Sequence, residues 1–353
     1  MKQAKASLLR VWLFRPSQVR ERGALLENTN VLGLGNLPVE STRSKRDKQL
    51  TRDQEKAWAN LLMRTSLSRT CEGLVPPEAF VFAREPRGKP VVDWEQTLFR
   101  AGLPNHSALP GRVAFNMTHT NGMMACATLY RAHERREDSL LTVGIDLESI
   151  QRRPRKGVET LARRRLAGPE AEWILQSATE EEKAQRFLEI WTLKEAYLKA
   201  TGDGLSSGLG LKKFCIHFQD GIDATVAGAG QDRETNCPTD SELTKGARRM
   251  NIQREAIRAN NHTVGPTSLM AETGAFQGYE GDASAEGWQG VLFEVERTHL
   301  LALCYNLQWT RGAQTGPMPL ASRPMHCNLE LVSTIPLLGP DKKVEARMLA
   351  STL

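Results

Sequence analysis

Residues 191–205 read WTLKEAYLKATGDGL, and this stretch decides the fold because it closes the best-marked helix of the chain. The helix start is marked by Thr179 with Glu182 three positions later, which is a capping-box pattern. Apolar side chains then recur at helical spacing until Gly202, where a glycine just past the last turn gives the expected stop. We therefore predict one long helix between Thr179 and Gly202.

Shorter elements surround this helix on both sides. An Asn-Gly pair at 121–122 joins two strand-like runs within 113–130, which is a strong signal for a hairpin. The pattern also predicts a helix at 53–69 and strands at 8–14, 140–148, 211–219, 289–297 and 299–308. The basic residues of the N-terminus would also suit an organellar transit segment, but we favour the strand.

A weak internal repeat links two of these regions. Thr118-His119 leads into MMACATLY, and Thr298-His299 leads into LLALCYNL. Two similar α/β lobes would produce this echo. Between the predicted strands at 211–219 and 289–297, residues 227–287 are rich in small and polar residues and show no periodicity. This composition predicts an insertion or disorder.

The composition is that of an ordinary globular protein and excludes several classes. The 353 residues carry 47 Lys and Arg against 41 Asp and Glu, so the net charge of +6 favours anionic partners. No apolar run approaches the roughly 18 residues that a transmembrane helix needs. The six cysteines are scattered and form no CxxC pair, which argues against a zinc ribbon or a disulfide framework.

Two carboxylates end the strand at 140–148. Asp146 and Glu148 alternate with apolar residues, so they project on one face about 7 Å apart and could together hold a hard divalent cation. In the long helix, Glu195 and Lys199 share a face because they are four residues apart. The pair is either a surface ion pair or a third metal carboxylate beside a cation that meets phosphate.

A histidine with two neighbouring hydroxyls lies beside the hairpin. Thr118 and His119 in FNMTHT could bind phosphate through hydroxyl and imidazole donors, although a lone histidine is more often structural. The segment 151–165, QRRPRKGVETLARRR, is strongly basic. Such runs are either solvated surface or a docking patch for an anionic partner.

Three segments in this order, FNMTHT, VGIDLE and WTLKEAYLKATGDGL, together resemble the signature motifs of one family. They are similar to those of the 4′-phosphopantetheinyl transferases, specifically the two-lobed Sfp (surfactin-synthetase-activating) type. Arg64 in ANLLMR and the Gly-Lys-Pro at 88–90 also resemble the N-terminal lobe of that family. The resemblance covers roughly residues 10–225 and the strands at 289–308.

The resemblance implies an α+β fold of two similar α/β lobes related by a pseudo-twofold axis, each a small, mainly antiparallel sheet packed with helices. We expect an N-terminal lobe over 1–139 and a C-terminal lobe over 140–310 that carries the insertion 227–287. Residues 311–353 contain several prolines and no clear pattern, so we expect a loosely ordered tail.

The resemblance also implies a reaction. Members of the family move the 4′-phosphopantetheine arm of coenzyme A, the co-substrate, onto a serine of an apo acyl or peptidyl carrier protein. Adenosine 3′,5′-bisphosphate is released, and Mg²⁺, or alternatively Mn²⁺, assists. We expect a cytoplasmic monomer that serves carrier proteins of fatty-acid, polyketide, nonribosomal-peptide or lysine synthesis, with no nucleic-acid or membrane partner.

By the same resemblance, site roles carry over residue by residue. Asp146, Glu148 and Glu195 would bind the metal, and Glu195 would also act as the catalytic base. Lys199 would stabilise the leaving phosphate, with Lys194 as a second cation nearby. Thr118 and His119 would contact the nucleotide phosphates of coenzyme A. Its 3′-phosphate and adenine end would be held by Arg64, with Lys48, Arg52 and Lys89 as further candidates.

The sequence departs from the family pattern in three places, one of which is the insertion 227–287, since compact members have no counterpart to it. Thr118 replaces the usual serine but keeps the hydroxyl. In LAGPEAEW, either Glu170 or Glu172 could take the place of a glutamate that relatives carry near the metal. Two other readings stay open: a basic nucleic-acid-binding protein, and a catalytically silent relative that binds only coenzyme A or a carrier.

Overall fold

The computed structural model describes the two lobes and leaves several connecting segments undescribed. The described residues are 7–17, 52–104, 109, 111–120, 122–132, 141–152, 157–203, 210–219, 248–254, 288–306, 327–334, 342–344 and 346–351. All structural statements below concern these ranges.

The N-terminal lobe is one helix on a three-strand unit. Strand β1 (Ser7–Phe14) precedes helix α2 (Arg52–Thr70), and the hairpin of β4 (Gly111–Thr120) and β5 (Met123–Ala132) follows. In the sheet, β5 lies between β1 and β4, and both pairings are antiparallel. Gly122 has a positive φ of 77° in the hairpin turn. The predicted first strand, helix and hairpin are confirmed.

The C-terminal lobe repeats this topology. Strand β6 (Thr142–Ser149) precedes helix α6 (Glu180–Thr201), and the hairpin of β9 (Trp288–Val295) and β10 (His299–Asn306) follows. The strand order β6-β10-β9 matches β1-β5-β4, again with antiparallel neighbours. The same strand–helix–hairpin order in both halves confirms the predicted two-lobed α+β fold.

Smaller elements complete the lobes. In the first lobe they are the 3₁₀ turn η2 (Pro77–Ala79), β2 (Phe82–Arg84), β3 (Pro90–Val92) and α3 (Trp94–Arg100). In the second they are α4 (Val158–Arg165), α5 (Gly168–Leu175), the 3₁₀ turn η4 (Leu211–Lys213), β7 (Phe214–Gln219) and β8 (Arg248–Arg254). Strand β8 falls inside the predicted insertion 227–287, whose remaining residues lie outside the described ranges.

The tail contributes strands to both lobes, which differs from the loosely ordered segment we expected. Strand β11 (Cys327–Ser333) pairs in parallel with β1, and the two-residue β12 (Lys342–Lys343) pairs with β11. Strand β13 (Ala346–Ser351) then pairs antiparallel with β9 of the other lobe. The expectation was wrong here because these strands are specified by the open edges of distant partners, whose backbone groups need hydrogen bonds. Local proline content does not report that.

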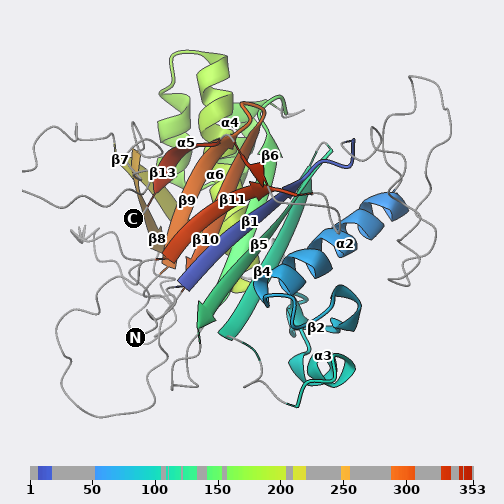
Figure 1. Cartoon of the computed structure of the whole chain (residues 1–353). Helices are drawn as coiled ribbons and strands as arrows, with labels where there is room; N and C mark the ends of the chain where they lie inside the picture. The colour runs from blue at the N-terminus through green and yellow to red at the C-terminus, as the bar shows by residue number, and fades with distance from the viewer. Residues whose placement is uncertain are drawn as a thin grey trace, which may run out of the picture.

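The core lies between the two sheets, and the helices cover the outer faces (Figure 1). One continuous apolar cluster joins side chains of β1 and β5 to side chains of β6, β9 and β10. Helix α2 packs on the far side of the first sheet, and α6 packs on the far side of the second. Cys126 and Cys304 are buried free thiols, as expected from their apolar settings.

Helix α6 begins and ends as the sequence predicts. The Thr179 hydroxyl accepts a hydrogen bond from the Glu182 amide at 3.1 Å, and Gly202 closes the helix with a left-handed φ of 74°. The fully buried Tyr197 fixes the helix to its sheet, with ring centroids 4.8 Å from Phe214 and 5.1 Å from Trp288. Such aromatic pairs contribute about 0.5–1.5 kcal/mol each beyond area burial.

No described helix is both long enough and apolar enough to cross a membrane.

Candidate functional site

Three sequence motifs meet at the junction of the lobes. Lys199 of α6 donates to Asp146 Oδ1 of β6 at 2.6 Å and to the Thr118 hydroxyl of β4 at 3.1 Å. Thr118 in turn donates to Asp146 Oδ1 at 3.2 Å. Thr118 and Asp146 are each 6% exposed. A hydroxyl, a carboxylate and an ammonium group from three separate elements therefore form one hydrogen-bonded group.

Two neighbouring residues place these elements at the required separation. Asn116 is buried on β4, and its side-chain carbonyl accepts from the backbone N–H of Ile145 on β6 at 3.2 Å. This bond joins the edge strands of the two sheets one residue before Asp146. Gly144 lets α6 approach β6 closely, since a Cβ there would lie under 3.0 Å from backbone atoms of Ala196 and Ala200.

Three carboxylates of the site each keep one buried oxygen without a hydrogen-bond partner. These oxygens are Asp146 Oδ2, Glu148 Oε2 and Glu195 Oε1. Burial raises the pKa of Glu148, opposed by the ion pair with Arg152. Burial and then the negative charge of Asp146 raise the pKa of Glu195 to about 7. These three side chains, called the carboxylate cluster below, therefore lie close enough together for their charges to act on one another.

The donor chemistry of this group fits a hard divalent cation, which prefers carboxylate oxygens. In the arrangement described, Lys199 holds the second oxygen of Asp146 and Arg152 holds that of Glu148. Among the described residues, no three His, Cys, Asp or Glu side chains already stand at metal-binding geometry. The carboxylates would therefore have to close in on an ion by side-chain rotation.

The two predicted phosphate contacts of β4 differ in accessibility. Thr118 is buried and already hydrogen-bonded within the site. His119 is the next residue and is exposed at the end of the strand. Because successive side chains of a strand alternate, the imidazole and the hydroxyl point to opposite faces.

Lys194 does not lie where the resemblance placed it. Its side chain is fully buried, pairs with Glu170 Oε2 at 2.7 Å and donates to the carbonyls of Leu211 and Phe214, each at 2.5 Å. The ammonium also lies 4.3 Å from the centre of the Phe214 ring. The resemblance placed Lys194 as a second cation near the leaving phosphate, whereas in the structure this buried cation ties α6 to α5 and β7.

Glu170 is likewise a structural residue. Besides Lys194, its carboxylate accepts from the backbone N–H groups of Ala167 and Ile216, at 2.9 and 2.7 Å. Burial raises the pKa of Glu170, and Lys194 opposes this rise. Glu172 is exposed on α5. Neither residue joins the carboxylate cluster of Asp146, Glu148 and Glu195.

Two predicted basic contacts of the first lobe make internal hydrogen bonds. Arg64 donates to Asn60 Oδ1 at 2.6 Å and to the carbonyls of Pro77 and Phe80 at 3.0 and 2.7 Å. Burial, and then the charge of Arg100, lower its pKa.

Lys89 donates across the lobe junction to Thr142 Oγ1 at 2.7 Å and to the Ala200 carbonyl at 2.6 Å, and burial lowers its pKa to about 8. Arg52 is exposed at the start of α2, and Lys48 lies outside the described residues.

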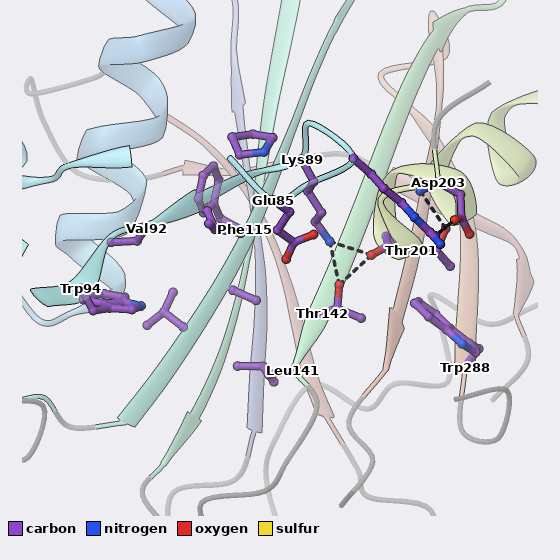
Figure 2. Close-up of a pocket in the computed structure, with 16 residues that line it drawn as sticks. Glu85, Lys89, Val92, Trp94, Phe115, Leu141, Thr142, Thr201, Asp203 and Trp288 are labelled. Carbon is purple, nitrogen blue, oxygen red and sulfur yellow. Dashed lines mark hydrogen bonds and ion pairs between the residues drawn. The ribbon is translucent and has the colours of Figure 1, made fainter. Parts of the chain in front are cut away.

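A pocket of about 590 Å³ lies at the same junction, beyond Lys89 (Figure 2). Trp94 and Phe115 line it from the first lobe, while Thr201 and Trp288 line it from the second. The three carboxylates are not part of its lining. The pocket therefore lies next to the carboxylate cluster, near the C-terminal end of α6.

The sequence reasoning missed Arg152 as a member of the site. Its guanidinium pairs with Glu148, and its charge also acts on Glu195. The four-residue spacing after Glu148 was the available signal, but Arg152 stood within a run of basic residues that we assigned as a whole to surface or docking.

Comparisons with known proteins agree with these motifs. Residues 142–250 match the 4′-phosphopantetheinyl transferase superfamily. The chain is 36% identical over 132 residues to the 4′-phosphopantetheinyl transferase HetI of Nostoc sp., covering 37% of this chain and 46% of the relative.

Two further relatives are similar to this chain. The 4′-phosphopantetheinyl transferase gsp of Aneurinibacillus migulanus is 30% identical over 132 residues, covering 37% of this chain and 42% of the relative. The putative 4′-phosphopantetheinyl transferase slr0495 of Synechocystis sp. is 29% identical over 177 residues, covering 48% and 60%. The chain spans about half the length of the curated relatives it matches.

Proposed function

We propose that the chain transfers 4′-phosphopantetheine from coenzyme A to a carrier-protein serine, because residues 142–250 match the 4′-phosphopantetheinyl transferase superfamily. The finer assignment is holo-[acyl-carrier-protein] synthase, which releases adenosine 3′,5′-bisphosphate. One observation carries the proposal: Thr118, Asp146 and Lys199, one from each motif, are hydrogen-bonded to one another, and Glu148 and Glu195 nearby each keep one buried carboxylate oxygen.

The proposed reaction is attack by an alcohol on the β-phosphorus of a pyrophosphate. Such transfers depend mainly on positioning and on neutralising charge at the phosphate oxygens. In this proposal Asp146, Glu148 and Glu195 hold Mg²⁺, which would neutralise pyrophosphate charge when bound. Their three buried, unpartnered oxygens support this role.

Lys199 and Glu195 take the remaining chemical roles. The Lys199 ammonium already lies beside Asp146 and neutralises charge on the leaving phosphate. Glu195 accepts the proton of the attacking serine.

In this proposal coenzyme A extends from the carboxylate cluster into the 590 Å³ pocket. Lys89 lines that pocket, and the Trp94 ring supplies a surface on which adenine can stack. His119 is exposed and free to reach a phosphate from the end of β4. The phosphate role of Arg64 stays a proposal that requires its guanidinium to exchange the carbonyls of Pro77 and Phe80 for substrate.

The protein partner is an acidic carrier domain. Arg163, Arg164 and Arg165 are exposed in the last turn of α4, within the basic segment 151–165. A positive patch of this kind raises the rate of encounter with an acidic partner more than the final affinity.

One assay tests the reaction. The protein is incubated with coenzyme A, Mg²⁺ and several apo carrier proteins, and mass spectrometry measures the added phosphopantetheine. We expect addition that is lost with a chelator and restored by Mg²⁺. No addition to any carrier by folded protein would overturn the proposal.

Variants then test the residue roles. Glu195→Gln and Asp146→Ala should each lower transfer by at least about 100-fold, because each removes a charge that the transition state requires. Glu181→Gln is the matched control, since Glu181 is exposed on the same helix. Transfer at the wild-type rate by Glu195→Gln would contradict the base and metal roles of that residue.

A further inference from the structure

The turn between β2 and β3 in the N-terminal lobe touches the C-terminal end of α6 in the other lobe. We propose that Arg87 and Asp203 form a clasp between the lobes here, assisted by Lys89, and that this clasp sets the shape of the pocket for the nucleotide end of the substrate. The inference rests on the proposed function for the identity of that substrate. Arg87 and Asp203 are thereby positioning residues.

The turn has a well-defined backbone. Gly88 N–H donates to the Glu85 carbonyl at 2.7 Å, and Glu85 N–H donates to the Lys89 carbonyl at 2.9 Å. Pro86 occupies the second position of the turn and Gly88 the fourth, where proline and glycine are favoured. Gly88 has a φ of 90°, which side-chain-bearing residues rarely adopt. This short turn presents Arg87 at its tip and Lys89 at the start of the returning strand.

Lys89 forms the inner part of the contact. Its ammonium donates to the Ala200 carbonyl in the last turn of α6 at 2.6 Å, and to Thr142 at the start of β6 at 2.7 Å. Helix C-termini carry unpaired carbonyls and partial negative charge, so a cation there is favourable. The Lys89 stem also lies beside Gly202. One side chain of the first lobe thus binds two elements of the second.

Arg87 and Asp203 form the outer part. The Arg87 guanidinium pairs with Asp203 Oδ1, and the two side chains are 64% and 5% exposed. Asp203 is held in place by its own backbone, whose N–H donates to the Leu198 carbonyl at 3.1 Å. A carboxylate buried to this degree needs a partner, and Arg87 is a partner from the opposite lobe. The pair is therefore worth more than an exposed ion pair.

Arg87, Lys89 and Asp203 all line the pocket, and Figure 2 labels Lys89 and Asp203 there. The pocket walls otherwise come from both lobes, with Trp94 on one side and Trp288 on the other. Releasing the clasp would let these walls separate. The catalytic group would be less affected, because Lys199 is held separately by Asp146 and Thr118. We therefore expect the clasp to act on substrate binding rather than on the chemical step.

A different role for Arg87 makes the opposite prediction. If Arg87 bound a substrate phosphate directly, Asp203 would compete for it, and removing the Asp203 charge would strengthen binding. The clasp requires both partners, so removing either one weakens binding equally. Removing the second charge after the first then changes nothing more, which is the signature of a coupled pair.

The experiment measures binding of adenosine 3′,5′-bisphosphate to the full chain by calorimetry. The variants are Arg87→Gln, Asp203→Asn, the double variant and Arg87→Lys. We expect about a tenfold weaker affinity in each single variant, the same loss in the double variant and partial recovery in Arg87→Lys. In carrier modification, KM for coenzyme A should rise by a similar factor while kcat stays within about twofold.

A matched control uses the exposed pair of Asp53 and Lys56 on α2, whose side chains are 95% and 79% exposed. Asp53→Asn with Lys56→Gln should leave affinity unchanged. Wild-type affinity in both single clasp variants, additive losses in the double variant, or tighter binding by Asp203→Asn would each overturn the clasp. Wild-type protein that binds no nucleotide and modifies no carrier would instead overturn the proposed function.

Discussion

A substitution of Gly144 gives the sharpest test of how the fold positions the carboxylate cluster of Asp146, Glu148 and Glu195. A Cβ at this position would lie under 3.0 Å from the Ala196 carbonyl and from the amide nitrogen and Cα of Ala200. All three are backbone atoms of α6, so no side-chain rotation can relieve the contact. In Gly144→Ala, α6 must move away from β6 by about 1 Å to restore ordinary van der Waals separation.

This movement has two measurable costs. Overpacking of a well-packed interface typically costs about 1–3 kcal/mol of unfolding free energy. For a domain of this size that corresponds to a fall in Tm of about 2–12 °C. The same shift carries Glu195 and Lys199 away from Asp146. Since a misplacement of about 1 Å can lower a rate by roughly 100-fold, we expect carrier modification to fall by that factor.

Gly168→Ala is the matched control, because Gly168 begins α5 with no heavy atom near its notional Cβ. Its Tm should stay within about 2 °C of wild type and its transfer rate should not change. The two variants are compared by thermal unfolding and by the mass-spectrometric assay. If Gly144→Ala matched Gly168→Ala in both, the close approach of β6 and α6 would be refuted. A lower Tm with full activity would refute the link between helix position and catalysis.

Two other buried groups give predictions for stability. Lys194→Met leaves the Glu170 carboxylate buried without its cation, so urea unfolding should show a fall of about 3–5 kcal/mol in the free energy of unfolding. Adding Glu170→Leu to the same chain should recover part of this loss. Unchanged stability in Lys194→Met would contradict the pairing. Burial, and then the charge of Arg15, lower the pKa of His299 from 6.5 to about 4. Between pH 6.5 and 4 the imidazole is therefore protonated in the unfolded chain and neutral in the folded chain. Stability should therefore drop by about 3 kcal/mol as the pH falls from 6.5 to 4, and His299→Gln should remove this part of the acid sensitivity in thermal scans from pH 7 to 4; an identical pH profile would show that His299 is not the group responsible.

Local patterns in the sequence predicted the elements well, because each pattern acts within a few residues. The Thr179 cap and the Gly202 stop bound α6 as expected, and the Asn-Gly pair at 121–122 marked the hairpin of β4 and β5. The alternation of VGIDLE placed Asp146 and Glu148 on one face of a strand, and both carry buried carboxylates. Such signals need no knowledge of distant partners.

Predictions failed where the outcome depended on contacts far along the chain. Lys194 and Glu195 are neighbours in one motif, yet a rotation of about 100° per residue around the helix turns one ammonium into the core and leaves its neighbour at the site. The tail gave no strand signal because β11 and β13 are completed by β1 and β9, more than 50 residues away in sequence in each case. Burial and strand pairing of this kind are set by the partner.

The sequence by itself therefore determined the chemical inventory of this protein: three carboxylates, Lys199 and a hydroxyl at spacings that suit a metal and a phosphate. Tertiary structure alone decided which charged residues serve that inventory. It buried Lys194 against Glu170, brought Arg152 to Glu148 and joined Arg87 to Asp203 across the lobes. The reason is physical: spacing fixes which side chains share an element, whereas the partner of a charge depends on which surfaces the two lobes bring together.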